Sequence, residues 1–223
     1  RLAVGVSPAL TSPDMKYDRK IRIAFAGGGR RIGKAHQISA LMDNQAELVA
    51  GCFSRDAERN REIARELFVA PERTYASIEE LAEKEAALPE EKRIDVVSII
   101  TPNGRHFPYT KLFLEAGFHV ICEKPMTCTL AQAREIVSLV ESTGRVYALT
   151  HNYTGNLLVR QVREMMKSGE LGELSRFIVE YLQGGDRINI PNTPGEIDPE
   201  TTSAGGSISD IVTHALNLLE YIS

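Results

Sequence analysis

The feature that most constrains this 223-residue chain is a regular alternation of short apolar segments with helical ones between positions 21 and 150. The apolar segments have the length of strands, and they are Ile21–Ala26, Leu48–Phe53, Ile94–Ile100, Phe118–Cys122 and Arg145–Thr150. Strands that alternate with helices through short connections form right-handed crossovers and a parallel sheet. Because the strands are apolar along nearly their whole length, we expect helices on both faces of the sheet. The sequence therefore predicts an α/β fold of the doubly wound, Rossmann type.

The segments between these strands carry apolar residues at helical spacing. In the first segment Ala35, Ile38, Leu41 and Met42 recur as the apolar face of an amphipathic helix. Further helices are expected at 57–68, 78–85, 108–116 and 130–140, and Gly144 is expected to cap the last one.

The pattern changes after Thr150. A helix around 159–166 is followed by one convincing strand, Phe177–Leu182, then by a Gly/Pro/Thr-rich loop at 183–207 and a helix that starts near Ser209. Residues 151–223 hold too little strand for a closed second sheet, so we interpret the chain as incomplete. Residues 1–20 are interrupted by glycine and proline, and we interpret them as a flexible leader, with Met15 nearer to a natural start.

Charge and composition exclude several classes of protein. The chain has 26 Lys and Arg against 30 Asp and Glu, without the concentrated basic face of a nucleic-acid-binding protein. No apolar run reaches the ~20 residues that span a membrane, and the first residues lack the apolar core of a secretory signal. The three cysteines form no pairwise motif, which favours reduced thiols and a cytoplasmic location.

A glycine-rich turn follows the first predicted strand and reads Ala26-Gly27-Gly28-Gly29-Arg30-Arg31-Ile32-Gly33. Glycines at such a turn let backbone amides approach a pyrophosphate at the N-terminus of the next helix. The usual G-x-G-x-x-G spacing is met by Gly27 and Gly29 but then shifts, since Ile32 holds the third position and Gly33 follows it. We expect Gly27, Gly29, Ile32 and Gly33 to hold a dinucleotide. A tight turn without a ligand is the simpler alternative.

The end of the second strand bears on the choice of dinucleotide. An acid there holds the ribose hydroxyls of NAD, whereas a basic residue accommodates the 2′-phosphate of NADP. The strand ends with Ser54 and Arg55, which suit the phosphate, and Asp56 is interpreted as the N-cap of the next helix. The sequence therefore predicts an NADP or NAD site, with NADP slightly favoured.

Polar residues also follow the fourth predicted strand. Thr101, Pro102 and Asn103 come directly after it, and His106 opens the next helix. Ending a strand and starting a helix would be their simple role. Since ligands of open α/β sheets bind outside the carboxyl ends of the strands, we expect these four residues to line the cofactor site.

Glu123, Lys124 and Pro125 end the fifth predicted strand and place an ionisable pair at the same edge. A cation at the position of Lys124 could stabilise negative charge on the reacting oxygen of a substrate. Asp210 and His214 are four residues apart and would share one face of a helix. They form either a surface contact or a histidine oriented by an acid to act as general base. A metal site is not expected, because no third ligand has matching spacing.

Taken in order, the glycine turn, T-P-N-x-x-H, E-K-P and D-x-x-x-H resemble the Gfo/Idh/MocA oxidoreductases from Ile21 to the C-terminus. The resemblance implies a Rossmann domain at 21–150 and, at 151–223, the first part of an α+β domain with an antiparallel sheet. It implies NAD(P)-dependent oxidation or reduction of a sugar, polyol or related small molecule, and a homo-oligomer in full-length relatives. Lys124 would hold the reacting oxygen, His214 would exchange the proton and Asp210 would orient it, while Glu123 and Lys124 would also line the cofactor site.

Two other functions stay open. One is a glycosidase of the same family that oxidises its substrate transiently through bound NAD. The other is a non-catalytic NAD(P)-binding sensor or regulator. The short C-terminal part favours this alternative, whereas the retained Lys124, Asp210 and His214 argue against it.

Overall fold

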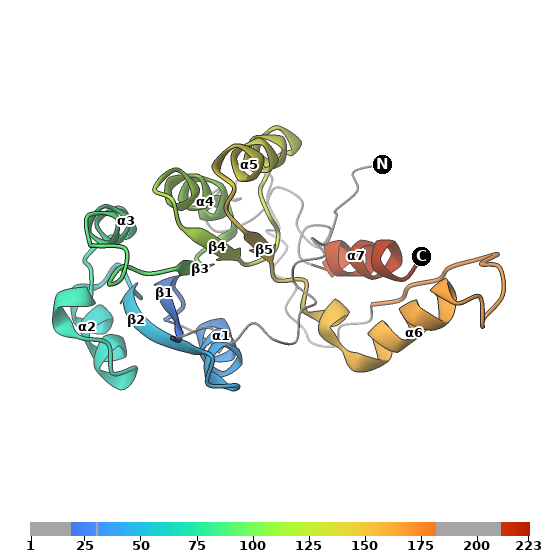
Figure 1. Ribbon diagram of the computed structural model, residues 1–223, viewed down its shortest axis with the longest axis horizontal. Coiled ribbons are helices and arrows are strands. Elements are labelled where there is room, and N and C mark those ends of the chain that lie inside the picture. The colour runs from blue at the N-terminus through green and yellow to red at the C-terminus, as the bar shows by residue number, and fades with distance from the viewer. Residues whose placement is uncertain (1–18, 30, 182–210) are drawn as a thin grey trace, which may run out of the picture.

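A computed structural model describes residues 19–29, 31–181 and 211–223. The described residues contain a parallel sheet with the strand order β2-β1-β3-β4-β5 (Figure 1). Its strands are β1 (Ile21–Gly27), β2 (Ala46–Cys52), β3 (Val96–Ile100), β4 (His119–Cys122) and β5 (Tyr147–Leu149). Each strand lies within two residues of its predicted bounds, and the predicted Rossmann-type sheet is confirmed.

Helices separate the strands as the sequence predicts. They are α1 (Arg31–Leu41), α2 (Ala57–Glu66), α3 (Ile78–Ala86), α4 (His106–Glu115) and α5 (Leu130–Thr143), with short 3-10 turns at Pro71–Arg73 and Asn103–Arg105. Figure 1 shows α1 and α2 on one side of the sheet and α3, α4 and α5 on the other. Gly144 ends α5 in the left-handed conformation, as expected for a glycine cap.

Alternate residues of one strand supply two separate cores. Ala24 and Ala26 of β1 belong to the core beneath α3, α4 and α5, whereas Ile23 and Phe25 belong to the core beneath α1 and α2. Because successive side chains of a strand point to opposite faces, a strand with both kinds buried must be covered on both sides. The strands are apolar along nearly their whole length in the sequence because both of their faces are buried.

The predicted apolar face of α1 is wrong. Ile38 is 59% exposed and Met42 is 76% exposed. The helix instead turns Gly33, His36 and Ala40 toward the sheet, with Gly33 buried and Ala40 packed on the core. Those three positions also recur at helical spacing, but two of the residues are small and one is polar. A prediction based on hydrophobicity alone therefore chose the other face of the helix.

The connections reverse direction between β1 and β3. The chain passes through α1 to the edge strand β2, returns to β3 beside β1, and then continues outward through β4 and β5. The loops that leave β1 and β3 therefore lie next to each other, and Gly28 N–H donates to Ile100 O at 3.1 Å across them. Ligands of open α/β sheets bind at such a reversal.

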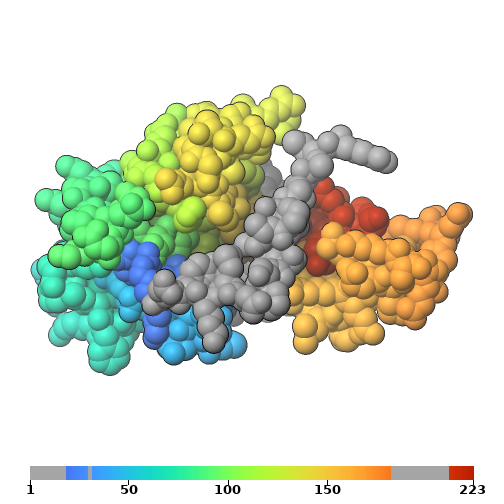
Figure 2. All heavy atoms as spheres, in the orientation of Figure 1, coloured from blue at the N-terminus to red at the C-terminus, as the bar shows by residue number. Residues whose placement is uncertain are grey.

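After β5 the chain forms a short turn (Asn152–Gly155) and two helices that contact each other, α6 (Leu157–Lys167) and α7 (Thr213–Ile222). They make a lobe beside the sheet in Figure 2, at the orange and red end of the colour bar. The predicted strand Phe177–Leu182 is wrong over 177–181, which form no strand. A strand needs a neighbour for its backbone hydrogen bonds, and no described strand pairs with this segment.

Several predictions fall on residues that the structure does not describe: the leader up to residue 18, Leu182, the loop 183–207 and Ser209. Cys52 and Cys122 are buried, Cys128 is partly buried, and all three are free thiols. Among the described residues, no helix has the length and apolar character needed to cross a membrane.

Candidate functional site

The glycine turn after β1 is shaped by close backbone contacts. Gly27 and Gly28 have φ of +88° and +86°, which favour glycine. A Cβ on Gly29 would lie 2.8 Å from Phe53 O, and a Cβ on Gly33 would lie 1.7 Å from Gly28 O. The turn is thus pressed against the ends of β2 and β3 and against the start of α1. Ile32 is 52% exposed at that start, and it is Gly33 that makes the close approach to the backbone of Gly28.

The end of β2 lies beside this turn. Asp56 is the N-cap of α2, and its carboxylate accepts from Arg59 N–H at 2.7 Å, as the sequence predicts. Ser54 Oγ accepts from Asp56 N–H at 3.1 Å, and Arg55 is exposed. The arginine is therefore the charged group at this corner that is available to a ligand, because the neighbouring acid is occupied by the helix end.

The loop after β3 places Thr101 and Asn103 partly buried and Pro102 exposed. His106 is fully buried behind them, with Nδ1 2.7 Å from Pro125 O and Nε2 2.9 Å from Thr101 O. An enclosed ring has no surface to offer a cofactor. The direct contact that we expected of His106 is thus replaced by a supporting position, in which the ring joins the loop after β3 to the loop after β4.

Glu123 and Lys124 follow β4, and the Lys124–Pro125 peptide bond is cis. The Glu123 side chain is 20% exposed and accepts from Thr150 Oγ1 at 2.8 Å. Burial by itself would raise the pKa of this carboxyl, but hydrogen bonds from His36 and Thr150 and the charges of His36 and Lys124 lower it. Glu123 is therefore held as a carboxylate beside Lys124.

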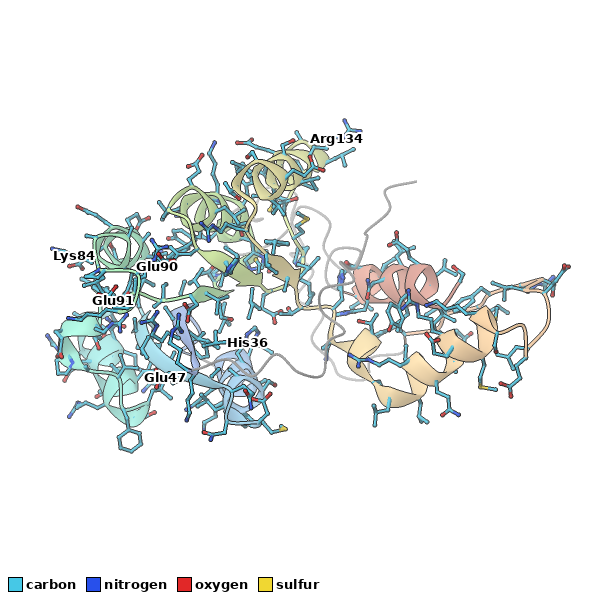
Figure 3. All side chains as sticks on the ribbon, in the orientation of Figure 1. His36, Glu47, Lys84, Glu90, Glu91 and Arg134 are labelled. Atoms are coloured by element: carbon cyan, nitrogen blue, oxygen red, sulfur yellow. The ribbon has the colours of Figure 1, made fainter. Side chains whose placement is uncertain are left out.

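His36 belongs to α1 (Figure 3) and reaches this carboxylate. Its Nε2 lies 2.7 Å from Glu123 Oε1, and its Nδ1 lies 2.9 Å from Ser98 Oγ on β3. The ring also meets Phe25 edge-on, with 6.5 Å between centroids. Residues from α1, β3, β4 and the end of β5 thus converge at the carboxyl edge of the sheet.

His214 lies near the start of α7 and is 8% exposed. Rings surround it: Tyr153 and His151 meet it edge-on at 4.9 and 5.6 Å, and Tyr181 stacks on it at 6.1 Å. Burial first, and then the charges of His214 and Lys124, lower the pKa of His151. Thr150, the residue before His151, donates to Glu123, the residue before Lys124, and the ring of His151 meets that of His214, so these contacts link the loop of Lys124 to the start of α7. Asp210 lies outside the described residues.

Comparisons with known proteins agree with this geometry. Residues 21–151 match the family model described as "Oxidoreductase family, NAD-binding Rossmann fold", and residues 159–223 match that of the GFO/IDH/MocA C-terminal domain. An uncharacterized oxidoreductase of Bacillus subtilis, YfiI, is 36% identical over 213 residues, which cover 92% of this chain and 53% of that protein. The chain belongs to the Gfo/Idh/MocA oxidoreductase family.

Two further relatives carry more specific names. D-glucoside 3-dehydrogenase of Escherichia coli is 32% identical over 202 residues, covering 91% of this chain and 54% of the enzyme. The crystal structure of an inositol dehydrogenase homolog from Azotobacter vinelandii in complex with NAD⁺ is similar with a TM-score of 0.82 and 36% identity, covering 93% of this chain and 54% of that one. This Gfo/Idh/MocA chain thus spans about half the length of the relatives that it matches.

Sequence reasoning missed four residues that the structure places at or beside the predicted site of this family member: His36, Ser98, Thr150 and His151. Thr150 and His151 follow β5, so the rule that polar residues at strand ends face the ligand edge would have selected them. Ser98 and His36 gave a weaker signal, a polar residue inside an apolar strand and a histidine three residues after Gly33.

Proposed function

We propose that this chain is the nucleotide-binding domain, residues 21–150, and the first part of the substrate domain, residues 151–223, of an NAD(P)-dependent oxidoreductase. Its reaction would interconvert a hydroxyl and a carbonyl carbon of a sugar, polyol or related compound. The observation that carries the proposal is the hydrogen bond from Thr150 to Glu123, which joins the loop of Lys124 to the loop of His151 at the edge where the connections reverse. This edge lies next to a turn too tight for any residue but glycine. The relatives named for a D-glucoside and for inositol support the class of substrate.

The described residues fit a dinucleotide. Backbone groups of Gly27, Gly28 and Gly29 can approach phosphates, because no side chain stands in the way, and α1 begins two residues later. When bound, the nicotinamide supplies the hydride exchange of such a reaction. We propose that Gly27, Gly29, Gly33, Thr101, Pro102, Asn103 and Glu123 contribute to binding, with Ile32 at the turn.

The roles of the remaining residues concern charge and proton. Lys124 would donate to the oxygen of the reacting carbon and stabilise the negative charge that develops there. His214 would take up or return the hydroxyl proton, in an enclosure of Tyr153, Tyr181 and His151 that limits access of water. Asp210 would orient His214.

Ser54 and Arg55 support NADP over NAD, as the 2′-phosphate needs a cation and Asp56 caps α2. The relative solved with NAD⁺ shows that the fold also accepts the non-phosphorylated form. We expect an Arg55→Ala variant to lose about 10- to 100-fold in affinity for NADPH and little for NADH, since one charge-assisted hydrogen bond is worth about 1.5–3 kcal/mol. Arg59→Ala, an exposed arginine of α2 paired with Glu62, is the matched control.

Fluorescence titration of the chain with NADH and NADPH tests the proposal directly. Binding of at least one nucleotide is expected, and Lys124→Ala should weaken it. Absence of binding to both nucleotides would overturn the proposed function. Binding that Lys124→Ala leaves unchanged, together with no turnover of any sugar or polyol by the full-length protein, would favour a sensor. A glycosidase would instead cleave glycosides without net release of NADH.

A further inference from the structure

His36 occupies an unusual place for a polar side chain, between α1 and the middle of the sheet. Its side chain is 12% exposed, and its partner Ser98 on β3 is 2% exposed. An apolar residue of similar volume would fill this space without the cost of removing polar atoms from water. The polar atoms are instead paired: Nδ1 with Ser98 Oγ at 2.9 Å and Nε2 with Glu123 Oε1 at 2.7 Å.

The direction of these hydrogen bonds follows from the partners. An ionised carboxylate only accepts, so His36 Nε2–H donates to Glu123. In the neutral ring Nδ1 then accepts, and the Ser98 hydroxyl donates to it. Ser98 thereby selects the tautomer that can donate to the carboxylate, an assignment made from the hydrogen-bond network.

Glu123 is fixed from three sides. His36 donates to Oε1 from α1, Thr150 donates to the same oxygen at 2.8 Å from the end of β5, and Glu123 N–H donates to Ile99 O at 3.0 Å. Both the side chain and the backbone of Glu123 are held, and the next residue in the chain is Lys124. The position and charge environment of the lysine therefore depend on this carboxylate.

We propose that His36 is a positioning residue, which acts through Glu123 to set the place and charge environment of Lys124. The inference rests on the proposed function for the role of Lys124, but the contacts that carry it do not depend on a bound nucleotide. Ser98 acts in the same hydrogen-bond network, because it orients the ring of His36.

Two substitutions separate the hydrogen bond from the volume of the ring. The amide nitrogen of glutamine lies near the place of histidine Nε2, so His36→Gln can still donate to Glu123. The shorter asparagine reaches only the place of Nδ1, so His36→Asn keeps the polarity and a bond to Ser98 but loses the bond to Glu123. The pair therefore tests the contact to Glu123 rather than the presence of a polar group.

The main readout is the NMR resonance of Lys124 in the chain with ¹³C-methylated lysines, assigned with Lys124→Arg. We expect the resonance to move in His36→Asn and to return toward its original position in His36→Gln. Lys111 is an internal control: it pairs with Glu135 at 2.7 Å between α4 and α5, away from His36, and its resonance should stay in place. An unmoved Lys124 resonance in His36→Asn, or equal shifts in both variants, would overturn the proposal.

A second variant covers the case in which His36→Asn fails to fold. Ser98→Ala leaves the ring and Glu123 in place but removes the donor that selects the tautomer, so it should move the Lys124 resonance in the same direction by a smaller amount. No movement in Ser98→Ala would then contradict the proposal. In parallel titrations we expect His36→Asn to bind NADH or NADPH about tenfold more weakly and His36→Gln within about threefold of the original chain. If the original chain binds neither nucleotide, the proposed function fails, while the resonance of Lys124 still decides the role of His36.

Discussion

At Gly33 the backbone of α1 comes so close to the glycine turn that there is no room for the single carbon of an alanine side chain. A Cβ there would lie 1.7 Å from Gly28 O, and neither Gly28 O nor the backbone of Gly33 can move aside easily, because one follows β1 directly and the other lies in α1. We expect Gly33→Ala to lower the free energy of unfolding by about 2–3 kcal/mol, the upper part of the range for overpacking, and to abolish nucleotide binding. Urea unfolding and fluorescence titration measure the two effects.

Gly155→Ala is the control for that substitution. Gly155 has no atom within 4 Å of an added Cβ and does not have a positive φ. Its replacement by alanine should change the free energy of unfolding by less than about 0.5 kcal/mol. Equal losses at the two positions would show that the close approach to Gly28 does not govern the turn.

Individual residues also show how far the sequence alone can lead. The ends of strands identified Glu123 and Lys124, because the position of a residue after a strand is a local property of the chain. The partner of Glu123 is not local, since His36 lies 87 residues away and is brought there by the packing of α1 on the sheet. Likewise, the burial of His106 depends on the carbonyl oxygens of Thr101 and Pro125, which its sequence neighbours do not reveal.

At the scale of elements, the C-terminal end of α2 contains a correctable strain. Phe68 N–H donates to Arg65 O, and Val69 N–H donates to Ala64 O, which is the Schellman pattern. Phe68 occupies the left-handed position of that motif with φ +57° and is 94% exposed. A side chain in this conformation costs about 1–2 kcal/mol relative to glycine.

We therefore expect Phe68→Gly to raise the free energy of unfolding by about 0.5–1 kcal/mol, after allowing for the greater freedom of glycine in the unfolded chain. Thermal unfolding followed by circular dichroism measures the change. Phe68→Ala removes the exposed ring but keeps a Cβ at positive φ, so it should bring no comparable gain. A gain of equal size in both variants would assign the effect to the ring instead.

Elements differ in how well a pattern predicts them. The strands of the sheet were found because they are apolar on both faces, a signal that survives without knowledge of the neighbours. The face of α1 was not found, because the helix packs through Gly33, His36 and Ala40 and exposes Ile38, and Met42 is exposed just after its end. The predicted strand Phe177–Leu182 has the composition of a strand, but over 177–181, the part that the structure describes, no described strand pairs with it.

At the scale of the whole molecule, Asp95 ties the start of β1 to the start of β3. Arg19 donates to both of its carboxylate oxygens, at 2.7 and 2.8 Å, and Arg22 N–H donates to it at 2.7 Å. Burial alone would raise the pKa of Asp95, but these hydrogen bonds and the charges of the two arginines lower it to about 2. The ordinary pKa of an aspartate is about 3.9, so the folded state binds the proton less readily than the unfolded one.

The sign of the effect follows from linkage. The stability contributed by Asp95 is present above about pH 4 and is lost as the pH falls through about 2. Because Arg19 is half exposed, water screens its charge, and we expect Asp95 to contribute about 1–2 kcal/mol to the free energy of unfolding at pH 7. Urea unfolding of Asp95→Asn should show this loss at pH 7 and a smaller one at pH 3. Glu66→Gln, an exposed acid at the end of α2, serves as the control, and an equal pH dependence in both variants would contradict the assignment.

The hydrogen bonds around Glu123 have a consequence for the order of events during synthesis of the protein. His36 and Thr150 reach this carboxylate from positions 87 and 27 residues away along the chain, Ser98 holds the ring of His36, and Thr150 follows β5. A growing chain that has not yet reached residue 150 cannot close this set of contacts. A nucleotide that depends on them would be captured only after the sheet is complete, and its binding energy would then stabilise the finished domain against unfolding, by about 2.7 kcal/mol at a hundred times its Kd.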